Sequence, residues 1–253
     1  MPHHLPLRIA VLEADTPLPR TRAKHGGYGG VFTSLLKSGA DVLGREGLSS
    51  KKGLEISRWD VVYEQVYPEI GEIDAVLITG SKHNSFDDEP WILKLVEFIK
   101  EILAQDRVRI VGVCFGHQIL GRALGAKVAR SEVGWETSVC GVDLTEKGKE
   151  VFGLDKLSLH QMHRDIVYEY PEGVQDLGES DRCKVQAMYV PRKFISVQGH
   201  PEFNGEIMNE LLESRHAQGI FDDKTFEDSM GRAKNHHDGV AVAAAFLRFL
   251  LDD

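Results

Sequence analysis

One stretch of the chain runs directly from an apolar strand into a helix. Residues 108–113 are mostly apolar, as in a buried parallel strand, and residues 115–124 have a helical pattern. Cys114 stands at the corner between them, flanked by Gly112 and Gly116. This G-x-nucleophile-x-G spacing is typical of a nucleophile elbow, whose turn is so tight that larger neighbouring side chains would clash. The stretch therefore predicts an α/β protein with a reactive thiol at the end of a buried strand.

Strands and helices alternate through the first half of the chain, and this pattern predicts a mostly parallel sheet with helices on both faces. The second half is less regular, and the whole chain, residues 1–253, is expected to form a single domain. Strands are expected at residues 7–12, 59–66, 74–79, 108–113, 139–144, 183–190 and 194–197. Helices are expected at residues 31–37, from residue 89 onward, and at residues 115–124, 205–218, 225–230 and 240–251.

Composition excludes several classes of protein. The 30 Lys and Arg residues against 39 Asp and Glu residues give a net charge of −9, which argues against a nucleic-acid partner. The longest apolar stretch, residues 240–251, contains Arg248 and is too short to cross a membrane. Three cysteines cannot form a closed disulfide framework, and the first residues do not resemble a signal peptide, so a cytoplasmic location is expected. No nucleotide-binding motif is present, and neither a cofactor nor a metal is expected.

A thiol nucleophile needs a base, and the base needs a group that orients it. His200 and Glu202 are the candidates, because residues two apart in an extended segment point the same way and Pro201 stiffens the link between them. At the start of a helix, the dipole and the free N–H groups favour the thiolate of Cys114. The N–H of Phe115 points where a tetrahedral oxyanion would form.

Two segments resemble a known family. The run GVCFGHQILGRALGAKV, residues 112–128, resembles the nucleophile segment of class I glutamine amidotransferases, and VQGHPEF, residues 197–203, is similar to their His-Pro-Glu segment. The resemblance covers about residues 7–210. It implies a flavodoxin-like fold with the site at the carboxyl ends of the strands. It also implies hydrolysis of a γ-glutamyl amide through a thioester, with Cys114 as nucleophile, His200 as general base and then acid, and Glu202 as its orienting group.

The resemblance assigns three further positions. The backbone N–H groups of Gly80 and Phe115 would form the oxyanion hole, and Gln118 would contact the bound glutamine. Many members carry Gly-Gly-Pro where this chain has Thr-Gly-Ser at residues 79–81, and they commonly have an aromatic residue where this chain has Gly199. Gly199 is therefore expected to leave more room beside the base.

Segments at residues 25–36, 78–92 and 134–136 resemble a stand-alone branch of the family. That branch includes fungal amidotransferase-like proteins and plant γ-glutamyl peptidases, which implies glutathione or its conjugates as substrates. Two alternatives stay open: a glutaminase subunit that delivers ammonia to a separate synthetase partner, and a non-catalytic binding protein on the same fold. His160 and His163 are metal ligands, residues of a solvated strand, or neighbours of the oxyanion loop. Residues 163–165 match a loop that lies near the active site in relatives.

Overall fold

A nine-stranded sheet forms the centre of the computed structural model, which describes residues 5–252. Five neighbouring strands are parallel, and the remaining neighbours pair antiparallel. In sheet order the strands are β2 (Leu54–Asp60), β1 (Leu7–Glu13), β3 (Ala75–Ile78), β4 (Arg109–Val113), β11 (Phe194–Val197), β10 (Cys183–Val190), β9 (Gln175–Ser180), β6 (Glu136–Leu144) and β7 (Leu157–His163). Two further strands, β5 (Val128–Arg130) and β8 (Asp165–Val167), form a separate antiparallel pair.

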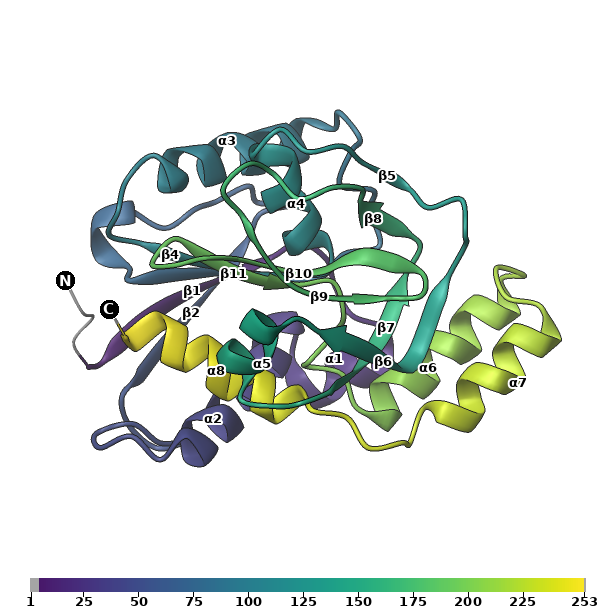
Figure 1. The fold of residues 1–253 in the computed structure, drawn as a ribbon. Helices are drawn as coiled ribbons and strands as arrows, with labels where there is room; N and C mark the ends of the chain where they lie inside the picture. The colour runs from purple at the N-terminus through teal and green to yellow at the C-terminus, as the bar shows by residue number, and fades with distance from the viewer. Residues whose placement is uncertain (1–4, 253) are drawn as a thin grey trace.

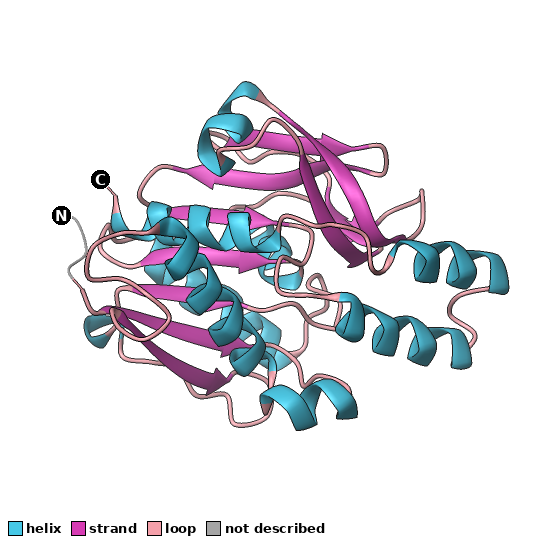
Figure 2. Ribbon diagram, turned by 90° about the horizontal axis from the view of Figure 1, so that it is seen from below, coloured by secondary structure: helices cyan, strands magenta, loops and turns pink. Residues whose placement is uncertain are grey.

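Helices cover both faces of the sheet (Figure 1), as the sequence predicts. On β1, Leu7, Ile9 and Val11 point into one apolar cluster, while Ala10 and Leu12 point into the other, because successive side chains of a strand face opposite sides. The first cluster contains α2 (Tyr28–Leu43) and α8 (Gly239–Leu251), and the second contains α3 (Pro90–Leu103) and α4 (Phe115–Ala123). Seen from below, helices lie in front of the strands of the sheet (Figure 2).

Of the remaining helices, α5 adds Phe152 to the first cluster. A third, smaller apolar cluster joins the start of α2 to α6 and to the segment before α7. The bounds are α1 (Pro19–His25), α5 (Glu146–Phe152), α6 (Gly205–Ala217), α7 (Asp223–Arg232) and a 3-10 turn, η1 (Ile70–Glu72). Within residues 5–252, no helix combines the length and the apolar character that crossing a membrane requires.

Strand register brings the ends of the parallel strands to one level. Ile78 of β3 lies opposite Gly112 of β4, and Val113 of β4 lies opposite Val197 of β11. The loops that leave these three strands therefore begin side by side at the carboxyl edge of the sheet. Gly80, Cys114 and His200 belong to those loops.

The strand expected at residues 59–66 is wrong. Strand β2 spans Leu54–Asp60 instead, and residues 61–64 form a turn. Because β2 is an edge strand whose side chains are half-buried or exposed, its sequence carries little of the apolar signal that marks the buried strands.

The end predicted for the first long helix is also wrong. Helix α2 continues through Ser38 and Gly39 to Leu43. The Ser38 hydroxyl donates to the carbonyl of Ser34 at 3.1 Å, one turn back, and so does not interrupt the helix. Gly39 marks a close crossing with α8 rather than a helix end, since a Cβ on Gly39 would lie 2.7 Å from the Cβ of Ala243.

Candidate active site

Cys114 occupies a strained corner between β4 and α4. Its φ of 52° and ψ of −102° lie outside the regions that residues other than glycine prefer, and such a conformation costs on the order of 1–3 kcal/mol. The Cys114 N–H donates to the carbonyl of Val197 at 2.9 Å, which fixes the corner to the end of β11. A Cβ on Gly116 would lie 2.4 Å from the carbonyl oxygen of Ile78, so the helix can start here only with glycine at that position. The predicted elbow is therefore present.

His200 and Glu202 form a buried pair at the end of β11. Nδ1 of His200 lies 2.8 Å from Oε1 of Glu202, and both side chains are at most 5% exposed. The carboxylate can only accept, so Nδ1 carries the hydrogen and Nε2 is left for another partner. The ring stacks on Phe203 with 4.0 Å between centroids, and the His200 N–H donates to the carbonyl of His160 at 2.7 Å. These contacts fix both the tautomer and the orientation of the imidazole.

The structure brings Cys114 and His200 together. The electrostatic influence of Cys114 reaches His200, and Gly80 lies against both residues. A Cβ on Gly80 would lie 2.7 Å from Cε1 of His200 and 3.6 Å from the Cβ of Cys114. Burial alone would lower the pKa of His200, but the adjacent charges and hydrogen bonds of Cys114 and Glu202 outweigh it and raise this pKa to about 10. The three side chains thus form one coupled, buried constellation.

The two residues expected to supply the oxyanion donors, Gly80 and Phe115, lie next to Cys114. Phe115 is the first residue of α4, and its N–H precedes the hydrogen-bonded turns of the helix. Neither this N–H nor that of Gly80 has an acceptor among residues 5–252. Phe115 itself is buried and stacks on Trp91, with ring centroids 5.6 Å apart. Both N–H groups are therefore free to bind a negatively charged oxygen.

Gln118 lies in the wall of the same cavity, but its amide is already occupied. Its oxygen accepts from the Ser85 hydroxyl at 3.0 Å. Its nitrogen donates to the Asp165 carbonyl at 2.8 Å and to the side chain of Gln198 at 3.1 Å. In this arrangement Gln118 braces the loop after β7, and its contact with bound glutamine stays a prediction.

Gly199 does not open space beside the base, contrary to the expectation from sequence. A Cβ on Gly199 would lie 2.9 Å from Nε2 of Gln161 and 3.0 Å from the Cβ of Leu159. Strand β7 therefore packs directly against this position. The glycine permits that approach, which also carries the hydrogen bond from His200 to His160.

Two cavities meet at the constellation. One, of about 360 Å³, is lined by Cys114 and Gln118, and the other, of about 160 Å³, is lined by Gly80 and His200. Residues common to both walls are Ser81, Lys82, Met162 and Arg215. The nucleophile and its base are thus reached from adjoining hollows at the carboxyl edge of the sheet, where the resemblance places the site.

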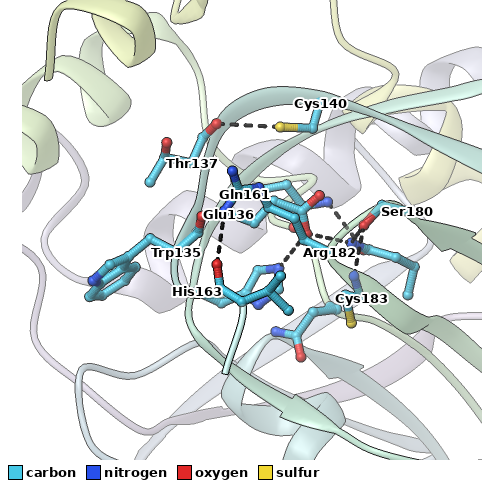
Figure 3. Close-up of polar contacts among 12 residues, drawn as sticks. Trp135, Glu136, Thr137, Cys140, Gln161, His163, Ser180, Arg182 and Cys183 are labelled. Atoms are coloured by element: carbon cyan, nitrogen blue, oxygen red, sulfur yellow. Dashed lines mark hydrogen bonds and ion pairs between the residues drawn. The ribbon is translucent and has the colours of Figure 1, made fainter. Parts of the chain in front are cut away.

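His163 forms a second buried pair with a carboxylate. Its Nε2 lies 3.0 Å from Oε2 of Glu136, which also accepts from Nε2 of Gln186 at 2.8 Å (Figure 3). Burial opposes ionisation of Glu136, but the hydrogen bond and charge of His163 outweigh it and lower the pKa of this carboxyl group. His163 and His160 are both buried, so the solvated-strand interpretation is wrong. In the described part of the chain, no group of three or more His, Cys, Asp or Glu residues could hold a metal ion.

Sequence reasoning missed three residues that line these cavities. Tyr28 and Arg215 line the smaller cavity, and Arg215 also lines the larger one together with Trp135. Burial raises the pKa of Tyr28 well above its ordinary value. Tyr28 stands in the glycine-rich run at residues 26–30, and Trp135 stands in the segment 134–136, so both had a sequence signal. Arg215 had none, because it is one of many charged residues on α6.

Comparison with known proteins identifies the family of this chain. The chain matches the family model described as glutamine amidotransferase class-I over residues 37–216, which is more than half of its length. A glutamine amidotransferase-like protein of Schizosaccharomyces pombe is 36% identical over 245 residues, covering 96% of this chain and 98% of that protein. Gamma-glutamyl peptidase 2 of Arabidopsis thaliana is 30% identical over 236 residues, covering 90% and 88%.

The fold is likewise shared with solved structures. A glutamine amidotransferase from Thermotoga maritima aligns with a TM-score of 0.73 at 18% identity, covering 99% of this chain and 100% of that chain. The central sheet with helices on both faces is therefore the fold that the resemblance implied. The matched model, the relatives and the shared fold lead to one conclusion: the chain belongs to the class I glutamine amidotransferase family.

Proposed function

We propose that this protein hydrolyses γ-glutamyl amides through a thioester on Cys114. The observation that carries the proposal is the buried His200 ring, which contacts Glu202 through Nδ1 and lies, together with Cys114, against Gly80. A thiol, an imidazole and a carboxylate in that order are the groups that thiol-dependent acyl transfer requires. The strained elbow supports the proposal, because it holds the thiol at the wall of a cavity.

The first half-reaction acylates the thiol. Because the pKa of His200 is raised to about 10, the proton of the Cys114 thiol rests on Nε2 of His200, and Sγ attacks the carbonyl carbon of the γ-amide as a thiolate. The N–H groups of Gly80 and Phe115 hold the resulting oxyanion, and losing one such donor typically costs about 10²–10³ in rate. The C–N bond then breaks as His200 returns its proton to the leaving nitrogen. The amine departs neutral, and the γ-glutamyl group stays on sulfur as a thioester.

The second half-reaction releases glutamate. A water molecule gives a proton to Nε2 of His200 as its oxygen attacks the thioester carbonyl. The C–S bond breaks, glutamate leaves, and the proton stays on Nε2, which restores the thiolate of Cys114. Glu202 stays ionised throughout, where it holds the imidazole in the required tautomer and stabilises the imidazolium. No cofactor, metal or second protein is needed for this sequence.

Glutathione and its conjugates are the proposed physiological substrates. This assignment rests on the 30% identity with gamma-glutamyl peptidase 2, which spans 90% of the chain. A cytoplasmic location, expected from the small number of cysteines, is part of the same proposal. The alternative, a glutaminase subunit that passes ammonia to a separate synthetase, uses the same thioester but a different leaving group.

A substrate panel with the purified protein tests the proposal. Glutamine, glutathione and a bulky glutathione S-conjugate are incubated with the wild type and with Cys114→Ala, and released glutamate is measured. We expect release from the glutathione compounds by the wild type alone. Release from glutamine alone, increasing when cell extract is added, would favour the glutaminase subunit. Equal release by Cys114→Ala, or none by the wild type, would contradict the thioester mechanism and favour a binding protein.

A further inference from the structure

Trp135 lies where two hollows of the surface join. It lines the cavity of about 360 Å³ that contains Cys114, and it also lines a larger groove of about 1110 Å³ between β6 and α7. Ile220 is the other residue common to both. A molecule that extends from Cys114 into the larger groove therefore passes along the Trp135 ring.

Two guanidinium groups lie over that ring. The Cζ of Arg164 lies 5.2 Å from the ring centroid, and the Cζ of Arg215 lies 5.0 Å from it. Arg164 follows β7 and Trp135 precedes β6, so the pairing of Glu136 with His163 places them side by side. The backbone of Trp135 is held in turn by Arg182, whose Nη1 donates to its carbonyl at 3.1 Å. Contacts between an aromatic face and a guanidinium fix both groups in orientation.

These two positive charges have no matching carboxylate. Across residues 5–252, neither Arg164 nor Arg215 forms an ion pair, and the Nε of Arg215 is buried without a hydrogen-bond partner. Burial lowers the pKa of Arg215, and the like charge of Arg164 lowers it further. Two cations on one ring repel each other, and an anion between them would relieve that repulsion. This arrangement is notable in a chain with a net charge of −9.

The lysine of the same cavity is already paired, since Nζ of Lys82 lies 2.6 Å from the carboxylate of Asp15. The carboxylate of that cavity, Asp165, is paired as well, with Arg130 at 3.1 Å. Arg164 and Arg215 are therefore the cations of this cavity that form no ion pair within residues 5–252.

The geometry points to a carboxylate subsite made by Arg164 and Arg215 on Trp135, which takes the carboxylate of the leaving group of a γ-glutamyl peptide. This inference rests on the proposed function and narrows its substrate class. The preferred substrates would be γ-glutamyl peptides that end in a free carboxylate, rather than glutamine, whose leaving group is ammonia. A planar guanidinium can bind a carboxylate through two parallel hydrogen bonds, which gives orientation as well as affinity.

The charges of the subsite suit the carboxylate of the leaving group better than the glutamyl end of the substrate. The glutamyl end of a substrate carries an ammonium group beside its α-carboxylate, so it needs an acceptor as well as donors. Two cations lie over the Trp135 ring, whereas the carboxylate of the same cavity, Asp165, is already paired with Arg130. Its position at the junction with the larger groove also lies on the route that a leaving peptide would take away from Cys114.

The test compares γ-glutamyl-alanine with its C-terminal carboxamide. Hydrolysis is followed by glutamate release, and affinity is measured by calorimetry on a Cys114→Ala background, where turnover does not interfere. We expect the wild type to prefer the carboxylate about 10- to 100-fold in kcat/KM and in affinity, the range of a hydrogen bond to a charged group. Arg215→Gln and Arg164→Gln should each bring that preference close to unity.

Arg22→Gln is the matched control, since Arg22 is an exposed arginine on α1 that lines neither cavity at Cys114 and His200. It should retain the wild-type preference. Arg215→Lys keeps the positive charge but cannot form two parallel hydrogen bonds to a carboxylate, so it should retain only part of the preference for the carboxylate. Thermal unfolding of each variant shows that the fold is intact.

Three results would overturn the subsite. The first is equal kcat/KM of the wild type for the two peptides, and the second is loss of the preference in Arg22→Gln. The third is an equal loss of affinity for both peptides and for glutamine in Arg215→Gln, which would mean that Arg215 binds the α-carboxylate of the glutamyl end. If the wild type hydrolyses all of these compounds without preference, the subsite fails while the proposed function stands. If it hydrolyses none of them, the proposed function itself fails and the subsite with it.

Discussion

The main chain of Gly80 lies directly against the imidazole of His200. A Cβ built on Gly80 would stand 2.7 Å from Cε1 of that ring, which is closer than two unbonded carbon atoms can approach. The ring cannot retreat freely, because Phe203 stacks on it at 4.0 Å and Glu202 holds Nδ1 at 2.8 Å. The loop after β3 therefore fixes the place of the ring that we propose as the base, and the Gly80 N–H is the oxyanion donor of the same proposal.

Gly80→Ala should impair catalysis far more than folding. The added methyl group would displace either the ring or the Gly80 N–H, and a misplacement of about 1 Å can cost on the order of 10²-fold in rate. Glutamate release from a γ-glutamyl peptide measures the loss. Gly141→Ala is the control, because nothing lies within 4 Å of a Cβ at that position. Wild-type turnover in Gly80→Ala would show that this contact does not position the base.

Glu202→Gln should leave the fold in place and remove most of the activity. The amide can present an N–H to Nδ1 of His200 and so favour the wrong tautomer, and a comparable change in a serine protease triad lowers kcat about 10⁴-fold. Turnover and the thermal unfolding midpoint, measured side by side, distinguish this from misfolding. Activity within a few-fold of the wild type would contradict the orienting role of Glu202.

Stability should depend on pH through His200. Its pKa in the folded protein is raised from 6.5 to about 10, mainly by Cys114 and Glu202 against the opposing effect of burial. Protonation therefore stabilises the fold fully below pH 6.5, and this contribution is lost as the pH rises toward 10.

The Cys114→Ala variant isolates this effect, because it removes the stronger of the two charges that raise the pKa. The free energy of unfolding in urea should fall more steeply from pH 6.5 to pH 10 in the wild type than in the variant. An NMR titration of the His200 ring should show a lower pKa in the variant. Parallel stability curves and an unchanged pKa would argue against this coupling.

Gly116→Ala should destabilise the fold, in contrast to the two variants at the base. The new Cβ would lie 2.4 Å from the carbonyl oxygen of Ile78, and overpacking of this kind typically costs about 1–3 kcal/mol. Urea unfolding measures the change, again with Gly141→Ala as control. A loss no larger than that of the control would mean that the start of α4 can shift without cost.

The parallel part of the fold and the central residues of the site were predictable from the sequence, because each depends on a short local pattern. Strand β4 with Cys114, and the end of β11 with His200 and Glu202, each occupy a single run of residues. Buried parallel strands are marked by apolar residues on both faces, and the elbow is marked by its glycines.

Strand β7 was not among the expected buried strands because half of its buried side chains are polar. His160, Gln161 and His163 lie in the interior, and hydrogen bonds such as that of His163 with Glu136 replace the apolar contacts expected there. Only the paired strands bring these partners together. Arg215 was missed for a related reason, since it meets Trp135 and Arg164 only through the packing of α6 against the ends of β6 and β7.

The sheet separates two tasks between its two halves. Gly80, Cys114 and His200 follow parallel strands, whereas Trp135 and Arg164 adjoin the antiparallel pair β6 and β7. Substitutions in that pair can therefore alter which amide is accepted while the thiol and its base keep their places. Proteins with this fold can therefore change their substrate through substitutions at the β6–β7 edge of the sheet, while the residues that follow the parallel strands stay the same.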